Sequence, residues 1–145
     1  MTNTHFPIEV GPVARVMNAG WKCQEALKGL LAKEKLTIAQ FSILLNIAKS
    51  KRNLRPGEIA KISRCTPTFA GRIIVDLCWK KLVERHHDGA DSRARLVTLT
   101  PLGKKVVKQA LVRIEAFQKS ELDGLIAHLS VQVQGGTDHE VFQAG

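Results

Sequence analysis

The sequence predicts a mostly α-helical chain with one small β-hairpin, an α+β fold class. Apolar residues recur at steps of three and four over most of the chain, as on the buried face of a helix. Threonine and proline helix-start signals precede several of these segments. Only between residues 82 and 100 does the pattern shift toward the two-residue period of strands, around a turn-forming tip.

Two helices are expected in the first third of the chain. The first covers about residues 11–35, where an imperfect apolar stripe includes Val13, Met17, Leu27 and Leu31. The second runs to about Lys51 and starts after Thr37, which forms a capping-box pattern with Gln40. Its predicted apolar face consists of Ile38, Phe41, Leu44, Leu45 and Ala48.

Two short helices with a brief connection follow, which is a helix-turn-helix arrangement. Pro56 and Pro67 mark their starts, because proline fixes φ near the helical value and lacks only an N–H that is unpaired there anyway. Thr66 is the expected N-cap of the second helix, which extends to about Lys81. The residues predicted to face inward are Ile59, Ala60, Ile62, Ala70, Ile73, Ile74, Leu77 and Cys78.

A β-hairpin and a long helix complete the pattern. Residues 82–87 and 95–100 alternate partially and flank the turn residues 88–92, so we expect a hairpin with a long basic tip. A helix then starts at Thr100 and Pro101 and continues toward residue 129, with a break or bend at Gly124. Residues from 131 onward are predicted to be loose. The apolar stripe of this helix is Leu102, Val106, Ala110, Ile114 and Phe117.

Charge and cysteine content favour an anionic partner in a reducing compartment. Twenty-two Lys and Arg against thirteen Asp and Glu give a net charge of +9 and a pI near 9.8. Three scattered cysteines argue against a disulfide scaffold. No signal peptide is visible, and the longest uncharged apolar stretch, Leu36–Ala48, is shorter than the roughly 18 residues of a membrane span. We therefore expect a cytoplasmic protein.

From Leu36 to Val106 the chain resembles the MarR-family winged helix-turn-helix regulators. Residues 91–103 follow the family pattern of Asp-x-Arg, a strand, and Leu-Thr-x-x-Gly. Residues 56–60, Pro-Gly-Glu-Ile-Ala, and residues 82–85, Leu-Val-Glu-Arg, resemble the first DNA-reading helix and the entry into the wing. Lys81 departs from the pattern, because the family usually has a glycine where this helix ends in a left-handed residue. Lysine is costly in that conformation, so we expect a different helix end.

The resemblance implies a winged helix-turn-helix with flanking dimerisation helices, in a single domain of residues 1–145. The DNA-binding lobe would cover about residues 36–100, and the dimerisation helices about 11–35 and 101–129. The apolar faces of these two long helices exceed one small core, so a second copy of the chain is expected to cover them. The implied function is a sequence-specific transcriptional regulator. It would be a homodimeric repressor on a pseudo-palindromic operator, released by a small, often aromatic or phenolic, effector that the sequence does not identify.

The predicted recognition helix presents a small set of candidate DNA contacts. Thr66, Thr68 and Phe69 lie in its first turn, where side chains reach base edges in the major groove, and Arg72 follows one turn later. Arg72 could bind guanine or a phosphate, and Phe69 could contact a thymine methyl or pack. Thr66 is interpreted mainly as a cap. Because polar side chains are few on this helix, its base-reading capacity is thin.

The wing and the helix-turn-helix supply the other candidates. Arg93 and Arg95 lie at or beside the hairpin tip, and an arginine there can enter the narrow minor groove. By resemblance, Arg93 is the groove residue, and Asp91 is expected to hold the wing by pairing with an arginine. Lys61 and Arg64 are expected to bind phosphates.

Other function classes have weaker support. A winged-helix adaptor that uses its basic face for an acidic protein is the alternative reading. The sequence has no phosphate-binding loop, nucleophile motif or paired acid–base set, so no enzyme is expected. No metal site or cofactor is expected, since His86 and His87 would point to opposite faces of a strand. Cys23 is read as an ordinary thiol, with a redox role left open.

Overall fold

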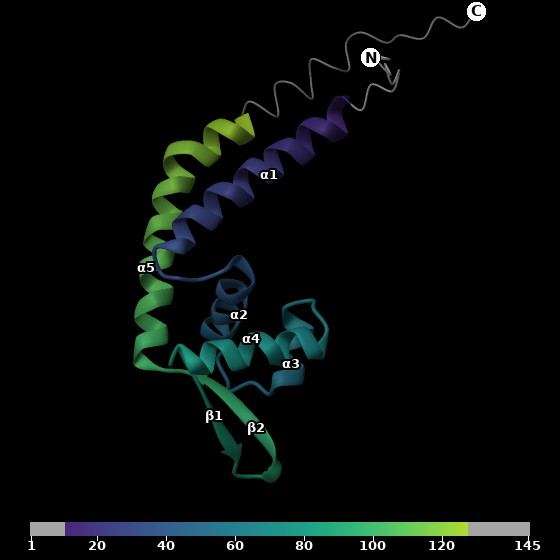
Figure 1. Ribbon diagram of the computed structural model, residues 1–145, viewed down its shortest axis with the longest axis vertical. Helices are drawn as coiled ribbons and strands as arrows, with labels where there is room; N and C mark the ends of the chain where they lie inside the picture. The colour runs from purple at the N-terminus through teal and green to yellow at the C-terminus, as the bar shows by residue number, and fades with distance from the viewer. Residues whose placement is uncertain (1–10, 128–145) are drawn as a thin grey trace, which may run out of the picture. The chain divides into compact units, whose positions relative to one another are not determined.

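The computed structural model describes residues 11–127, except for the side chain of Ser92. The predicted helix end at residue 129 and the segment from residue 131 therefore lie outside the described residues. The elements are α1 (Gly11–Ala32), α2 (Ile38–Lys49), α3 (Pro56–Ile62), α4 (Pro67–Trp79), β1 (Val83–Asp88), β2 (Asp91–Leu99) and α5 (Pro101–Phe117), followed by the π-helical turn η1 (Gln118–Leu122) (Figure 1). Five helices and one antiparallel hairpin confirm the predicted α+β class.

The described chain divides into two compact units. One contains residues 27–115, and the other contains residues 11–26 and 116–127. The first of these holds α2, α3 and α4, with the hairpin projecting away from the three helices (Figure 1). The predicted limits of the DNA-binding lobe, residues 36 and 100, lie inside it and stay a prediction.

Three predicted helix starts are confirmed by their caps. In the capping box of α2, the backbone N–H of Gln40 donates to Thr37 Oγ1 at 3.1 Å, and that of Thr37 donates to Gln40 Oε1 at 3.2 Å. Thr66 Oγ1 caps α4 by accepting from the N–H of Phe69 at 3.2 Å. Thr100 Oγ1 accepts from the N–H of Gly103 at 2.9 Å at the start of α5. Each threonine thus satisfies a donor that the helix leaves unpaired.

The apolar core of the larger unit joins all of its elements. The largest fully buried side chains come from α1, α2, α3, α4 and β2 and from the loop before α3, and they are Leu31, Ile43, Leu44, Leu54, Ile59, Ile74, Leu77 and Val97. Polar contacts support this core at its margin. Lys80 Nζ at the end of α4 donates to Gln40 Oε1 at 2.9 Å and also to the carbonyl of Lys35, and Arg113 pairs with Glu34.

Several predicted core positions were wrong. In α2 the buried face contains Ile43 and Ile47, whereas Ala48 is exposed. Ile62 in α3 is 49% exposed, and Leu102 in α5 is 47% exposed. Apolar residues occupy a broad arc of each of these helices, so more than one face of the helix could pack against the core. A rotation by a fraction of a turn is enough to bury a neighbouring row of residues instead. Packing against the neighbouring elements therefore determines which residues are buried, and the hydrophobic period of the sequence alone does not.

Of the break or bend predicted at Gly124, the break is absent. Helical backbone continues over residues 123–127, and no described glycine has positive φ. The helix is irregular just before Gly124, at the π-helical turn Gln118–Leu122. A π turn inserts one extra residue into a helix without ending it. Glycine permits a break but does not require one.

The end of α4 differs from the expectation for Lys81. Its φ is +58°, so the helix does end in a left-handed residue despite the lysine. The N–H of Leu82 donates to the carbonyl of Leu77 at 3.0 Å, and that of Lys81 donates to the carbonyl of Cys78 at 2.9 Å, which is a Schellman motif. Leu82 and Leu77 are both buried, so burial of the residue after the cap outweighs the backbone cost at Lys81.

Replacing this lysine should stabilise the protein. We expect Lys81→Gly to raise the free energy of unfolding by about 1 kcal/mol, because relief of roughly 1–2 kcal/mol of left-handed strain exceeds the entropy cost of glycine. Chemical denaturation measures the change. Lys105→Gly, in the interior of α5, is the control and should destabilise by about 1 kcal/mol. A loss of stability for both variants would contradict the strain argument.

Candidate nucleic-acid interface

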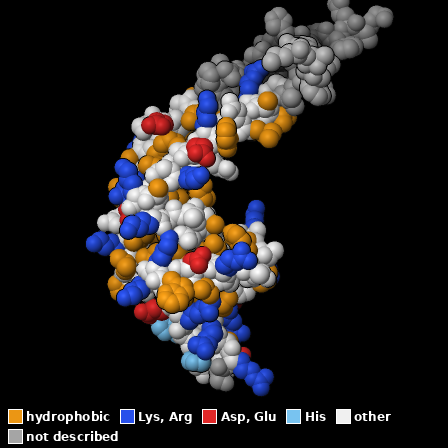
Figure 2. All heavy atoms as spheres, viewed as in Figure 1, with side chains coloured by type: hydrophobic (Ala, Val, Ile, Leu, Met, Phe, Trp, Pro, Cys, Tyr) orange, Lys and Arg blue, Asp and Glu red, His pale blue; other side chains and the backbone are white. Residues whose placement is uncertain are grey.

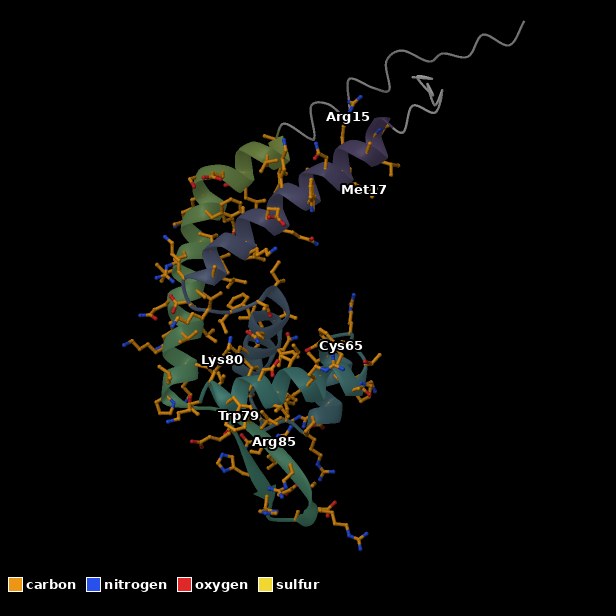
Figure 3. The ribbon with its side chains drawn as sticks, in the orientation of Figure 1. Arg15, Met17, Cys65, Trp79, Lys80 and Arg85 are labelled. Carbon is orange, nitrogen blue, oxygen red and sulfur yellow. The ribbon has the colours of Figure 1, made fainter. Side chains whose placement is uncertain are left out.

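The turn between α3 and α4 is held by a hydrogen bond from α2. Asn46 Nδ2 donates to Ser63 Oγ at 3.0 Å, and Cys65 at the connection packs against the core (Figure 3). Arg64 has a φ of +52°, and its side chain is exposed. The inner face of α4 is buried on Ala70, Ile73, Ile74 and Leu77, which directs the opposite face outward.

The four predicted recognition residues are all exposed on α4 or its N-cap. Thr66 has its hydroxyl oxygen engaged as the cap, while its O–H is still able to donate. Phe69 is 42% exposed, so its ring does not lie in the core. Arg72 makes no ion pair with any described residue. The exposed start of α4 thus offers a hydroxyl, an aromatic edge and an unpaired guanidinium.

The wing tip differs from the predicted long loop. The strands extend to Asp88 and Asp91, which pair with each other, and only Gly89 and Ala90 lie between them. His87 pairs with Arg95, so residues 92–94 of β2 have no partner across the ladder. Arg93 lies in this bulged stretch and is exposed. A bulge re-aims the side chains that it contains, so Arg93 is set apart from the regular face that holds Arg95.

The carboxylate that holds the wing is not the predicted one. Asp91 Oδ1 accepts from the backbone N–H of Arg93 at 3.0 Å, which shapes the bulge. Among the described residues, the aspartate that pairs with an arginine is Asp88, whose Oδ2 accepts from Arg55 Nη2 at 2.8 Å. The hydrogen bond from Arg55 holds the pKa of Asp88 below its ordinary value, and the same bond raises the pKa of Arg55.

The base of the wing explains the Leu-Thr-x-x-Gly pattern. The N–H of Val97 donates to the carbonyl of Leu54 at 2.8 Å, and that of Thr100 donates to the carbonyl of Leu82 at 3.1 Å. Besides capping α5, Thr100 donates through its hydroxyl to the carbonyl of Lys81 at 2.7 Å. The pattern therefore fastens the wing, the end of α4 and the start of α5 at one point.

Arg55, Arg52 and Glu58 form a polar cluster that was not among the predicted DNA contacts. Arg52 Nη1 donates to Glu58 Oε1 at 2.9 Å, and Glu58 Oε2 accepts from the N–H of Arg55 at 2.8 Å. Both bonds lower the pKa of Glu58, and the bond from the backbone N–H of Arg55 has the larger effect. One signal was present in the sequence. An arginine occupies the N-cap position of α3, where serine, threonine, aspartate or asparagine is usual.

The predicted phosphate-binding residues lie beside these elements. Lys61 and Arg64 are exposed at the end of α3 and in the turn that follows. Lys and Arg side chains lie over the helix-turn-helix and the hairpin as well as over the rest of the visible face, and Arg85 lies on β1 (Figures 2 and 3). All eight predicted DNA contacts thus occupy exposed positions in one unit.

Other kinds of site have less support in the described residues. They contain no group of three or more His, Cys, Asp and Glu placed to hold a metal ion. Within residues 11–127, no helix is long and apolar enough to cross a membrane. Cys23, Cys65 and Cys78 are free and half-buried, and the last two pack against the core.

No family model and no curated protein sequence matches the chain. Solved structures do. A mutant of MarR from E. coli in complex with operator DNA has a TM-score of 0.67 at 24% identity, covering 88% of this chain and 94% of MarR. An S. aureus MepR mutant bound to an oligodeoxyribonucleotide has a TM-score of 0.65 at 21% identity, covering 85% of this chain and 94% of MepR.

A third similar structure comes from a protein with a small-molecule regulator. BpsR of Bordetella bronchiseptica, whose DNA binding is regulated by 6-hydroxynicotinic acid, has a TM-score of 0.70 at 22% identity. The match covers 93% of this chain and 99% of BpsR. The order of helices, the helix-turn-helix and the wing agree with these comparisons, so the chain has the winged helix-turn-helix fold of the MarR-family transcription regulators.

Proposed function

We propose that this protein is a sequence-specific, DNA-binding transcriptional regulator of the cytoplasm rather than an enzyme. The observation that carries the proposal is the exposed start of α4 together with a wing whose bulge presents Arg93, both in the same compact unit. An exposed helix start suits the major groove, and an exposed arginine at a wing tip suits the adjacent minor groove. The DNA complexes of MarR and MepR support this reading through their shared fold.

The proposed contacts divide into reading and positioning. Arg72 binds a guanine edge or a phosphate, and Phe69 meets a thymine methyl. Thr66 at the N-cap and Thr68 in the first turn of α4 contact the DNA backbone or a base edge. Lys61 and Arg64 together with the end of α3 neutralise phosphates. Because only α4 and Arg93 reach base edges, most of the affinity comes from the charges.

A homodimer is the proposed assembly. Val13, Val16, Met17 and Trp21 are each more than half exposed on α1, at helical spacing along one face. Such a stripe needs a partner, and a second copy places two recognition helices on an inverted repeat. We expect sedimentation at micromolar concentration to show twice the chain mass of 16.0 kDa. A species of 16.0 kDa alone would overturn the dimer.

Repression with release by a small effector is the proposed mode of regulation. BpsR, with 6-hydroxynicotinic acid as its regulator, supports a small aromatic or phenolic effector here. Such a ligand can change the spacing of the two recognition helices only if it binds one spacing more tightly than the other.

Selection of bound duplexes from a random pool tests the function and provides a binding site. A recovered inverted repeat supports the regulator, whereas binding without sequence preference favours the protein-interaction adaptor instead.

On the selected duplex, Arg93→Ala should weaken binding by roughly 1–3 kcal/mol, and more strongly when the flanks are rich in A·T pairs. Lys61→Ala should cost less and act alike on all sequences. Equal, sequence-independent losses would reduce Arg93 to a phosphate contact.

A further inference from the structure

Arg55 occupies a helix N-cap but does not use its side chain as a cap. Its backbone is extended, with φ −82° and ψ 153°, and the capping bond comes instead from Glu58. The guanidinium reaches the far end of β1, where Nη2 donates to Asp88 Oδ2 at 2.8 Å. The position that normally stabilises α3 is thus occupied by a residue that ties α3 to the wing.

Asp88 is placed where a single contact can orient the wing tip. It is the last residue of β1, directly at the register shift, and the bulge with Arg93 lies opposite. Its Oδ1 accepts from the N–H of Ala90 at 3.1 Å, so one carboxylate both shapes the turn and meets Arg55. The side chain of Asp88 is 18% exposed and that of Arg55 is 48% exposed, so the pair is partly shielded from water.

The wing is attached to the rest of the lobe at two levels, at its base and nearer its tip. At its base, β2 bonds to Leu54 through the N–H of Val97. Nearer its tip, the Arg55–Asp88 pair makes the second attachment, and Arg55 is itself held by the Glu58 and Arg52 contacts. A hairpin fixed only at its base can swing, whereas a second attachment near the tip fixes its direction.

We propose that Arg55 and Asp88 are positioning residues that hold the wing against the start of α3 and so set where Arg93 meets the DNA. The inference rests on the proposed function. It also predicts whether removal of the Asp88 charge weakens or tightens DNA binding. Asp88 places a negative charge on a lobe that binds a polyanion, so simple electrostatics predicts that its removal tightens binding. Positioning predicts that its removal weakens binding.

Asp88→Asn separates these two predictions. Asparagine keeps an oxygen that can accept from the N–H of Ala90 and loses only the ion pair. On the selected duplex we expect about tenfold weaker binding, a part of the loss expected for Arg93→Ala. Asp76→Asn, which removes an exposed carboxylate of α4, is the charge control and should leave binding unchanged or tighter. Equal or tighter binding by Asp88→Asn would overturn the proposal.

A double variant shows whether Asp88 acts through Arg93. In the Arg93→Ala background, Asp88→Asn should cost less than twofold, because the residue that it positions is already gone. Full additivity of the two losses would overturn the positioning role. Arg55→Ser guards against a folding artefact, since serine caps α3 and should preserve thermal stability while DNA binding falls.

Hydrogen exchange of the free protein keeps this inference distinct from the proposed function. In Asp88→Asn, the backbone amides of residues 89–95 should exchange faster, while those of α2 and α4 should not change. Unchanged protection would show that the pair does not hold the wing. If the wild-type protein binds no duplex, the proposed function fails, and exchange still decides whether Arg55 and Asp88 hold the hairpin.

Discussion

Affinity for duplex DNA will fall about 10³–10⁵-fold between roughly 50 and 200 mM salt, if a dimer neutralises about six to ten phosphates. Each cation that meets a phosphate releases a condensed counterion, and salt opposes that release. The chain has a net charge of +9, and the contacts that we propose are those of the exposed Lys61, Arg64, Arg72 and Arg93. A titration of the selected duplex at several salt concentrations measures the slope.

The slope also distinguishes the interface from other surfaces. Lys61→Ala should reduce the slope of log affinity against log salt by about one unit, since it removes one phosphate contact. Lys105→Ala, on α5, is the control and should leave the slope unchanged. A flat salt response by the wild-type protein would show that the basic face does not bind DNA.

Gly103→Ala should destabilise the protein by about 3 kcal/mol or more, because the new methyl group has no room. A Cβ at this position would lie 2.0 Å from the carbonyl oxygen of Leu82 and 3.2 Å from Leu99 Cδ2. The first contact is with backbone, and that same carbonyl accepts from the N–H of Thr100. To relieve this clash, the backbone would have to shift at the point where the end of α4, β2 and the start of α5 meet. Thermal denaturation should show a melting temperature lower by roughly 10 °C.

Gly29→Ala is the matched control for this substitution. Gly29 lies inside α1, and a Cβ there would meet nothing within 4 Å. Alanine is a better helix former than glycine, so this variant should gain about 0.5–1 kcal/mol. Both variants are compared at one protein concentration, because the proposed dimer would make stability concentration-dependent. A neutral Gly103→Ala would mean that the carbonyl of Leu82 moves freely.

Local chemistry determined the elements and their starts. The threonine caps at residues 37, 66 and 100 act within three residues of themselves, so their hydrogen bonds could be inferred from the chain alone. The change of period near residue 82 located the hairpin for the same reason, since alternation depends only on neighbouring residues. Candidate DNA contacts followed from their place in these elements, and all of them are exposed.

Contacts between distant residues were decided only by the tertiary structure. The left-handed Lys81 is stabilised by burial of Leu82, and the rotation of α2 that buries Ile47 and exposes Ala48 is set by the packing of its neighbours. Arg55 and Asp88 lie 33 residues apart, and their pairing needs the wing to return beside α3. A sequence pattern carries short-range preferences, whereas the choice among distant partners depends on how whole elements pack.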